Sequence, residues 1–252
     1  MKVRVLFVLT AILMMIPSAS QAGWVIHEDS MGGSKRVVYL QKNKIYNDAK
    51  DISSLIDLDR GWIHLMNKSN KSYWGGSFEL FEKEMLAAID KQIDEQMKDL
   101  PADQRKAMKE RMRQGLMGLA GGKGKIEVVR TGKTARITGR DCDQYAVKVG
   151  GEVREEHWIA PSIRISREID PEKLQKQMSK LKMGTGLGGF TLAEPVSALW
   201  KKGYPLKKVY YVIGQRMVTR AVKAEQKSIP AKIFQVPASF RKVPVMEVIS
   251  KF

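Results

Sequence analysis

The sequence predicts an α+β fold in which helices are inserted into an open, antiparallel β sheet. Short runs of aliphatic and aromatic residues, separated by glycine- and asparagine-containing turns, fill the first part of the chain and are typical of a β meander. The connections between these runs are too short for helical crossovers, so antiparallel pairing is expected. Later segments repeat apolar residues every three or four positions, which is the period of an amphipathic helix.

A β-hairpin within Arg136–Pro161 is the best-defined predicted element. Apolar residues alternate from Tyr145 to Val149, Gly150–Gly151 supply a turn, and Val153–Ile159 form the return strand. Pro161 ends this strand because proline has no backbone N–H. The further strands that we predict are Trp24–Ser30, Arg36–Gln41, Lys44–Asn47, Ser53–Leu58, Trp62–Asn67, Tyr73–Trp74, Lys125–Thr131, Val209–Gly214 and Arg216–Ala224.

A helical hairpin is predicted at about residues 78–118. Its second helix begins near Pro101, because proline fits the first turn of a helix. Methionine at helical spacing is typical of an ordinary core, but a methionine-lined lid over a lipid cavity is an alternative. The apolar stripes are Phe78, Phe81, Met85, Ile89 and Ile93 in the first helix and Met108, Met112 and Leu116 in the second.

Two shorter helices are predicted in the second half of the chain. Asp170 caps a helix that begins with Pro171 and carries Met178 on its apolar stripe. A helix over Ala193–Lys202 ends at Gly203. From residue 231 onward the chain is expected to be short, extended and punctuated by prolines.

The N-terminus predicts export. Lys2 and Arg4 precede an apolar run, Val5–Ile16, which is shorter than the ~20 residues that span a bilayer. Ser20 and Ala22 are small residues at the positions that a signal peptidase recognises. We therefore predict cleavage after Ala22 and a single periplasmic domain over residues 23–252; an uncleaved membrane anchor is the alternative.

Cysteine content and charge narrow the functional classes. Cys142 is the only cysteine, so no internal disulfide can form, and a buried, unreactive thiol is expected. In an exported protein, the net charge of +17 favours anionic envelope surfaces over nucleic acid as partners.

The pattern Ile-x-Gly-x-x-Cys-x-x-Tyr-x-Val at Ile137–Val147, followed by Trp158–Pro161, resembles a family of exported bacterial proteins of unknown function. Gly203–Pro205 and Ile229–Pro237 fit the same family. That family is similar to the LolA/LolB lipoprotein carriers. The resemblance implies an open half-barrel whose concave face is covered by helices around an apolar cavity. It matches no individual ligand contact, and the helical hairpin here is longer and more basic than that fold leads us to expect.

Motifs for nucleotide, metal or acid–base chemistry are weak. Gly184–Gly189 match the dinucleotide fingerprint but follow a charged helix instead of a strand. His27, His64 and His157 are scattered, so neither a metal nor a cofactor is predicted. Glu155 and His157 share one side of a strand, where a surface salt-linked cluster is expected. No nucleophile can be paired with a base, so catalysis is the least supported class.

Two sets of residues are candidate binding sites. An aromatic and methionine-rich set, placed between sheet and helices, would bind an apolar or lipid-linked ligand without catalysis. A basic set with no acid among it would hold an anionic membrane, glycolipid or protein partner if it lay on one face; a solvated, dispersed arrangement is the alternative. The cavity set is Trp62, Trp74, Phe81, Met85, Ile89, Trp158 and Met178, and the basic set is Lys201, Lys202, Lys207, Lys208, Arg216 and Arg220.

Ligand binding is the preferred function, and an envelope interaction or sensor protein is the alternative. An outer-membrane-associated β protein is a minor alternative, suggested by the terminal Phe252. Ser250 and Pro244 depart from the strand signal of such proteins, and the predicted strands are short for a membrane barrel.

Overall fold

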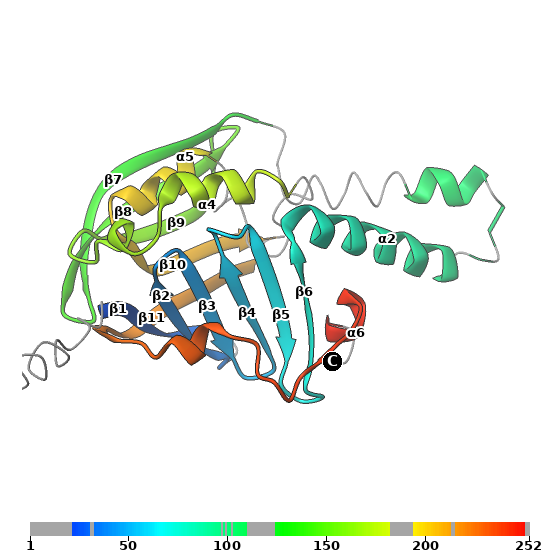
Figure 1. Cartoon of the computed structure of the whole chain (residues 1–252). Coiled ribbons are helices and arrows are strands. Elements are labelled where there is room, and N and C mark those ends of the chain that lie inside the picture. The colour runs from blue at the N-terminus through cyan, green and yellow to red at the C-terminus, as the bar shows by residue number, and fades with distance from the viewer. Residues whose placement is uncertain are drawn as a thin grey trace, which may run out of the picture.

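The computed structural model describes residues 22–30, 33–96, 98, 100–101, 103–109, 124–181, 194–212 and 215–249. Within these ranges, one sheet of 12 strands has the order β12-β6-β5-β4-β3-β2-β1-β11-β10-β9-β8-β7. The order begins and ends on different strands, so the sheet is open. Neighbouring strands are antiparallel except that β12 runs parallel to β6. The predicted open, mostly antiparallel sheet with a few helices is confirmed (Figure 1).

The predicted meander is confirmed. Its strands pair in sequence order, and Lys42 and Asn43 make the two-residue turn between the second and third strands with φ of 47° and 58°. The six strands are β1 (Ala22–Ser30), β2 (Lys35–Gln41), β3 (Lys44–Ala49), β4 (Ile52–Asp57), β5 (Trp62–Asn67) and β6 (Ser72–Ser77).

The central hairpin is confirmed as β8–β9, but its first predicted residues belong to another strand. Thr138 and Gly139, with φ of 49° and 75°, form an additional two-residue turn before β8. Thr-Gly is a weaker turn signal than Asn-Gly, so this turn was not predicted. The strands of this half are β7 (Ile126–Ile137), β8 (Arg140–Val149), β9 (Glu152–Ala160), β10 (Tyr204–Val212) and β11 (Gln215–Ser228).

Most of the predicted helices are present. Asp170 caps α4 by accepting hydrogen bonds from the backbone N–H groups of Glu172 and Lys173. Residues 103–109 are also helical, but Met108 is 41% exposed, so it is not buried as the predicted stripe implied. The helices are α2 (Phe78–Gln96), η2 (Ile165–Arg167), α4 (Pro171–Met178), α5 (Glu194–Ser197), η4 (Ala198–Lys201), η5 (Ala231–Phe234) and α6 (Val245–Ile249).

The expectation of an extended C-terminal segment is wrong in part. After η5 the chain adds the short strand β12 (Arg241–Lys242) to the edge of the sheet and then forms α6. Backbone N–H groups of Arg241 and Val243 donate to the carbonyls of Lys71 and Tyr73, at 2.9 and 2.8 Å. These contacts join residues far apart in the sequence, so local patterns could not predict them.

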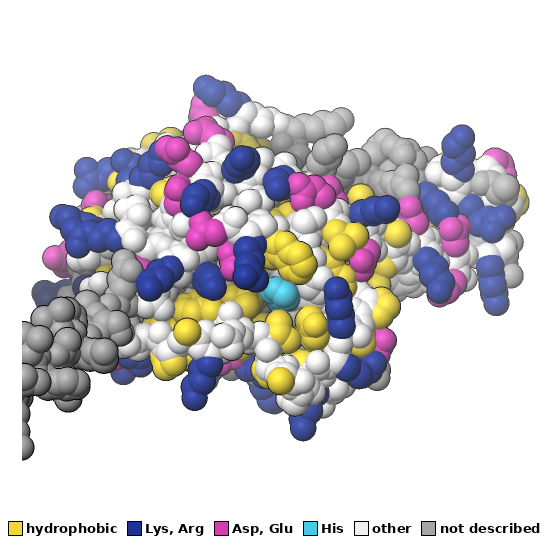
Figure 2. Space-filling view, in the orientation of Figure 1, with side chains coloured by type: hydrophobic (Ala, Val, Ile, Leu, Met, Phe, Trp, Pro, Cys, Tyr) yellow, Lys and Arg dark blue, Asp and Glu magenta, His cyan; other side chains and the backbone are white. Residues whose placement is uncertain are grey.

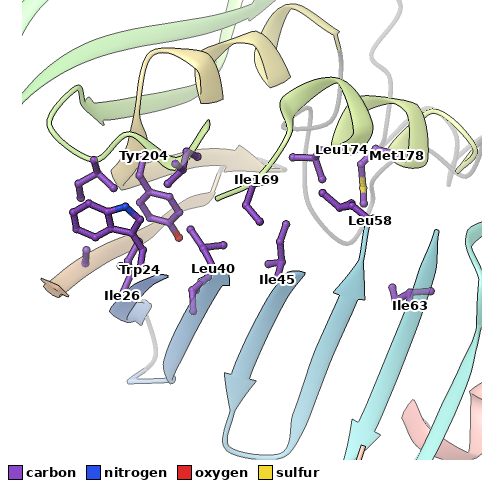
Figure 3. Packing of buried hydrophobic residues seen from close by; sticks show 14 of the residues in the cluster. Trp24, Ile26, Leu40, Ile45, Leu58, Ile63, Ile169, Leu174, Met178 and Tyr204 are labelled. Carbon is purple, nitrogen blue, oxygen red and sulfur yellow. The ribbon is translucent and has the colours of Figure 1, made fainter. Parts of the chain in front are cut away.

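Different segments cover the two faces of the meander. On one face, Trp24, Leu40 and Ile45 meet residues of η2 and α4 in the main core (Figure 3). Alternate residues on the other face, such as Val25 and Leu55, pack against the segment that contains η5. The strands β7–β9 arch over α4 and α5, so the helices lie on the inner side of a curved sheet (Figure 1).

Several predictions lie outside the described residues. These concern residues 1–21, 184–189, Met112, Leu116 and Phe252, and they remain predictions. Among the helices that the structure does describe, none combines the length and apolar character needed to cross a membrane.

Candidate ligand-binding groove

An open groove of about 900 Å³ lies between α2 and the C-terminal segment. Its volume falls within the range of small-molecule pockets, which is roughly 300–1,000 Å³. Polar side chains lie among apolar ones. The apolar lining residues are Trp74, Ala87, Ala88, Val243, Pro244, Val245 and Met246, and the polar ones are Glu84, Lys91, Gln92, Glu95 and Lys242.

The groove exists because α2 leaves the sheet. The helix follows β6 directly, and Ser77 Oγ accepts a hydrogen bond from the backbone N–H of Leu80 at 3.2 Å. Phe81 and Met85 then bury against the core, each 7% exposed. Farther along, the helix projects beyond the sheet (Figure 1), and two consecutive alanines, Ala87 and Ala88, leave space beside it.

Trp74 fixes the geometry of the groove wall. Its indole Nε1 donates a 2.7 Å hydrogen bond to Glu84 Oε2, and its ring centroid lies 5.5 Å from that of Phe81. The opposite wall is anchored by Asn67, whose Nδ2 donates to the carbonyl of Val248 at 2.9 Å. Both walls are therefore attached to neighbouring strands of one sheet.

The predicted cavity residues divide between several places. One group is formed by Trp74 of β6 with Phe81 and Met85 of α2. Ile89 lies half-buried on the same helix. Of these four residues, only Trp74 lines the groove. Met178, in α4, is buried in the main core and 7% exposed.

The other two predicted cavity residues lie elsewhere. Trp62 is 42% exposed and lies beside His64, with a centroid separation of 5.9 Å. It precedes Ile63, which points into the main core, so Trp62 points to the other side of β5. Trp158 is half-buried, and Lys207 Nζ lies 5.2 Å from the centroid of its ring.

Most residues of the groove cannot be predicted from the sequence. The two alanines interrupt an otherwise large-residue helix, and this signal was available. Residues 243–246 have no such signal in the sequence, because their position beside α2 depends on the pairing of β12 with β6.

The basic set does not form a single patch. Lys207 and Lys208 are consecutive in β10 and so point to opposite sides of the sheet. Lys202 Nζ lies 5.9 Å from the ring centroid of Tyr145, and Arg220 stands opposite Lys207 in the ladder. Figure 2 shows Lys and Arg side chains spread over the visible face with acidic side chains between many of them. The last two residues of the basic set are Lys201 and Arg216. Lys201 Nζ lies 3.4 Å from Glu172 Oε1, and Arg216 is paired with Tyr211 between β11 and β10.

A cluster of polar side chains around Glu28 is buried inside the sheet. Burial raises the pKa of Glu28, but Lys208, Arg36 and a hydrogen bond from Tyr204 together hold that pKa below its ordinary value. Arg36 Nη2 lies 2.6 Å and Tyr204 Oη 2.9 Å from the Glu28 carboxylate. These contacts join β1, β2 and β10, which identifies a structural cluster.

The Glu155–His157 pair corrects a prediction. His157 Nε2 lies 2.6 Å from Glu155 Oε2, and the two side chains are 2% and 1% exposed, so the pair is buried and not on the surface. Across the described ranges, no three His, Cys, Asp or Glu side chains gather to hold a metal ion. Cys142 is buried as predicted, and burial raises the pKa of its thiol to about 11.

Comparison with known proteins gives a family match for part of the chain. Residues 122–240 match the family described as "Domain of unknown function (DUF4412)", which spans β7 to η5. No curated protein matches the sequence.

Solved structures resemble the chain only distantly. An uncharacterized conserved protein from Thermus thermophilus aligns over 94% of this chain and 98% of its own, with a TM-score of 0.45 and 7% identity. PNGF-II aligns over 91% of this chain but 33% of its own, with a TM-score of 0.41 and 11% identity, so the chain spans about a third of that protein. A chain of the Pseudomonas aeruginosa MucA/MucB complex aligns over 92% of this chain and 62% of its own, with a TM-score of 0.38 and 10% identity. Such values assign neither ligand nor partner.

Proposed function

We propose that the protein binds an apolar or lipid-linked ligand, without catalysis, in the groove between α2 and the C-terminal segment. The observation that carries the proposal is an open groove of about 900 Å³ with Trp74 and two alanines in its lining and lysines among its charged groups. Removing apolar surface from water contributes about 25 cal/mol per Å² to the free energy of binding. An acyl chain that lies along this lining would therefore be stabilised by burial of its apolar surface.

The polar residues of the groove suit the other end of an amphiphile. Lys91 and Lys242 come from opposite walls, and each carries an ammonium group on a flexible stem. Lys91 lies 3.9 Å from Glu95 in an exposed pair, which contributes little stability and is readily exchanged for a ligand carboxylate. The ligand class is therefore an acyl chain with an anionic or polar head.

The cellular compartment and the half-barrel architecture are part of the same proposal. The sequence resemblance to LolA/LolB-like proteins and the curved, helix-filled sheet support a carrier-like half-barrel that acts in the periplasm after removal of residues 1–22. In this setting the groove would hold the acyl chains of a ligand in transit. The helices inside the curved sheet pack directly on it, so the binding place lies at the β6 edge instead of the centre of the concave face.

A groove-filling variant tests the proposal. Ala88→Trp adds an indole to the groove, and Ala107→Trp adds the same group to an exposed helical position as the matched control. With a dansyl-labelled fatty acid as the probe, we expect binding by the wild-type protein and the control, and roughly tenfold weaker binding by Ala88→Trp. Absence of binding to the wild-type protein, or equal binding by all three, would contradict the proposal.

A further inference from the structure

A second pocket, of about 500 Å³, lies beside β1 and the loop that follows β9. None of its residues lines the groove described above. Unlike that groove, it is built mainly from polar and cationic groups, so it suits a different ligand. Its lining residues are Trp24, Pro161, Ser162, Arg164, Arg167 and Gln226.

Two arginines of the pocket are placed together by η2. Arg164 is the residue before this 3₁₀ helix and Arg167 is its last residue. A 3₁₀ helix has three residues per turn, so positions three apart lie on the same side. Both side chains are exposed, and within the described part of the chain neither has a carboxylate partner.

A third guanidinium stands directly behind the pocket lining. Arg140 Cζ lies 5.3 Å from the centroid of the Trp24 ring, and its Nη1 donates to Ser162 Oγ at 3.4 Å. Nη2 approaches the carbonyl of Ala224 at 3.5 Å. Within the described ranges, the groups that hold Arg140 are therefore neutral, and its positive charge has no carboxylate partner among them.

A neighbouring carboxylate is already engaged. Glu225, one residue before the pocket residue Gln226, lies 2.8 Å from Lys223 Nζ and 2.5 Å from Lys227 Nζ. These two lysines hold the pKa of Glu225 at about 2, so it stays ionised and paired. This carboxylate consequently adds no neutralising charge for the three arginines.

We propose that this pocket binds the phosphate group of a phosphate ester or of free phosphate. A phosphate carries up to two negative charges and presents oxygens in several directions, whereas a carboxylate carries one charge in one plane. The paired guanidinium forks of Arg164 and Arg167 match phosphate oxygens bidentately, and the Ser162 hydroxyl adds a donor. Arg140 supplies the third charge at longer range.

The test compares two phosphate sources in one set of variants. Inorganic phosphate is titrated by calorimetry, and phosphatidic acid is presented in phosphatidylcholine vesicles in a flotation assay. Arg164→Gln/Arg167→Gln removes the two lining arginines, which are exposed, so folding is retained. Arg60→Gln/Arg154→Gln removes two equal charges from exposed arginines that belong to neither pocket nor to the basic set, and it is the matched control. We expect binding to fall by at least roughly tenfold in the first variant and to stay unchanged in the control.

The outcomes separate the sources. If the wild-type protein binds inorganic phosphate and the first variant does not, the pocket is a free-phosphate site. If the wild-type protein binds only the vesicles, and the first variant loses that binding, the pocket is a lipid headgroup site. The proposal is overturned if the wild-type protein binds neither probe, if the first variant binds as well as the wild type, or if the control is weakened equally. Arg164→Lys/Arg167→Lys keeps the charge and should still lose part of the affinity, because lysine lacks the planar fork.

Discussion

Trp74 and Glu84 join β6 to α2 through a 2.7 Å hydrogen bond from the indole Nε1 to a carboxylate oxygen. Trp74 is 2% exposed, so in the folded protein its N–H depends on Glu84 as its acceptor. The bond therefore attaches the second turn of α2 to β6, beside the groove.

Removing this acceptor is expected to destabilise the protein. Glu84→Ala leaves a buried donor unsatisfied, at a cost of about 1–3 kcal/mol of unfolding free energy, whereas Glu84→Gln retains an oxygen acceptor and should lose less. Urea unfolding monitored by tryptophan fluorescence measures both values. Equal stability of the alanine and glutamine variants would show that the hydrogen bond does not hold the helix.

Stability should fall on acidification because of Glu28. In the folded protein the pKa of Glu28 lies below its ordinary value of 4.5. The ionised carboxylate therefore stabilises the folded state fully above the unfolded-state pKa, and this stabilisation is lost as the pH falls through the folded-state pKa. Glu28→Gln removes this dependence and, because it leaves the partly buried Arg36 unpaired, should cost about 3 kcal/mol at neutral pH. Denaturation at a series of pH values tests both effects. An unchanged acid slope in the variant would assign the dependence to another group.

The thiol of Cys142 should be unreactive in the folded protein. Burial raises its pKa to about 11, so little thiolate exists near neutral pH, and the side chain is 1% exposed. The contribution of Cys142 to stability should be constant below the range in which the unfolded thiol ionises, around pH 9.0, and should decline above it. Ellman's reagent should label the protein only in guanidinium, with Cys142→Ala as the blank. Fast labelling of the native protein would contradict the buried position.

The cap of α4 offers a local test of the helix inside the curved sheet. Asp170 Oδ1 accepts from the backbone N–H groups of Glu172 and Lys173 at 2.9 and 3.2 Å. Asp170→Ala should cost about 1 kcal/mol, and Asp170→Asn, which keeps an oxygen acceptor, should cost much less. Thermal unfolding of the two variants measures the difference. Identical melting temperatures would mean that solvent replaces the cap.

Local patterns were sufficient for most of the elements. Alternation in β1–β5 and the glycine pair before β9 gave strands close to those observed, because a half-buried strand shows its period directly in the sequence. Asp170 and Pro171 marked the start of α4 for an equally local reason. Thr138–Gly139 was missed because its turn depends on two positive φ angles that Thr-Gly signals weakly.

The two candidate sites were much less predictable. Trp74 was identified, but the facing wall, which includes Val243 and Met246, reaches the groove only through the parallel pairing of β12 with β6. Arg164 and Arg167 were not predicted, because Glu168 and Asp170 follow them closely and the sequence around them is not predominantly basic. Their importance comes from η2 and from the pocket that they share with Trp24, which lies far away in the sequence.

Native mass spectrometry with organic extraction, applied to wild-type protein and to Ala88→Trp purified in parallel, tests the groove most directly. We predict a bound mass on the wild-type protein that extracts as a lipid or acylated species and is absent from the variant. The same bound species on both proteins would place the ligand elsewhere. Wild-type protein that remains free of ligand even after incubation with excess fatty acid would contradict the binding function itself.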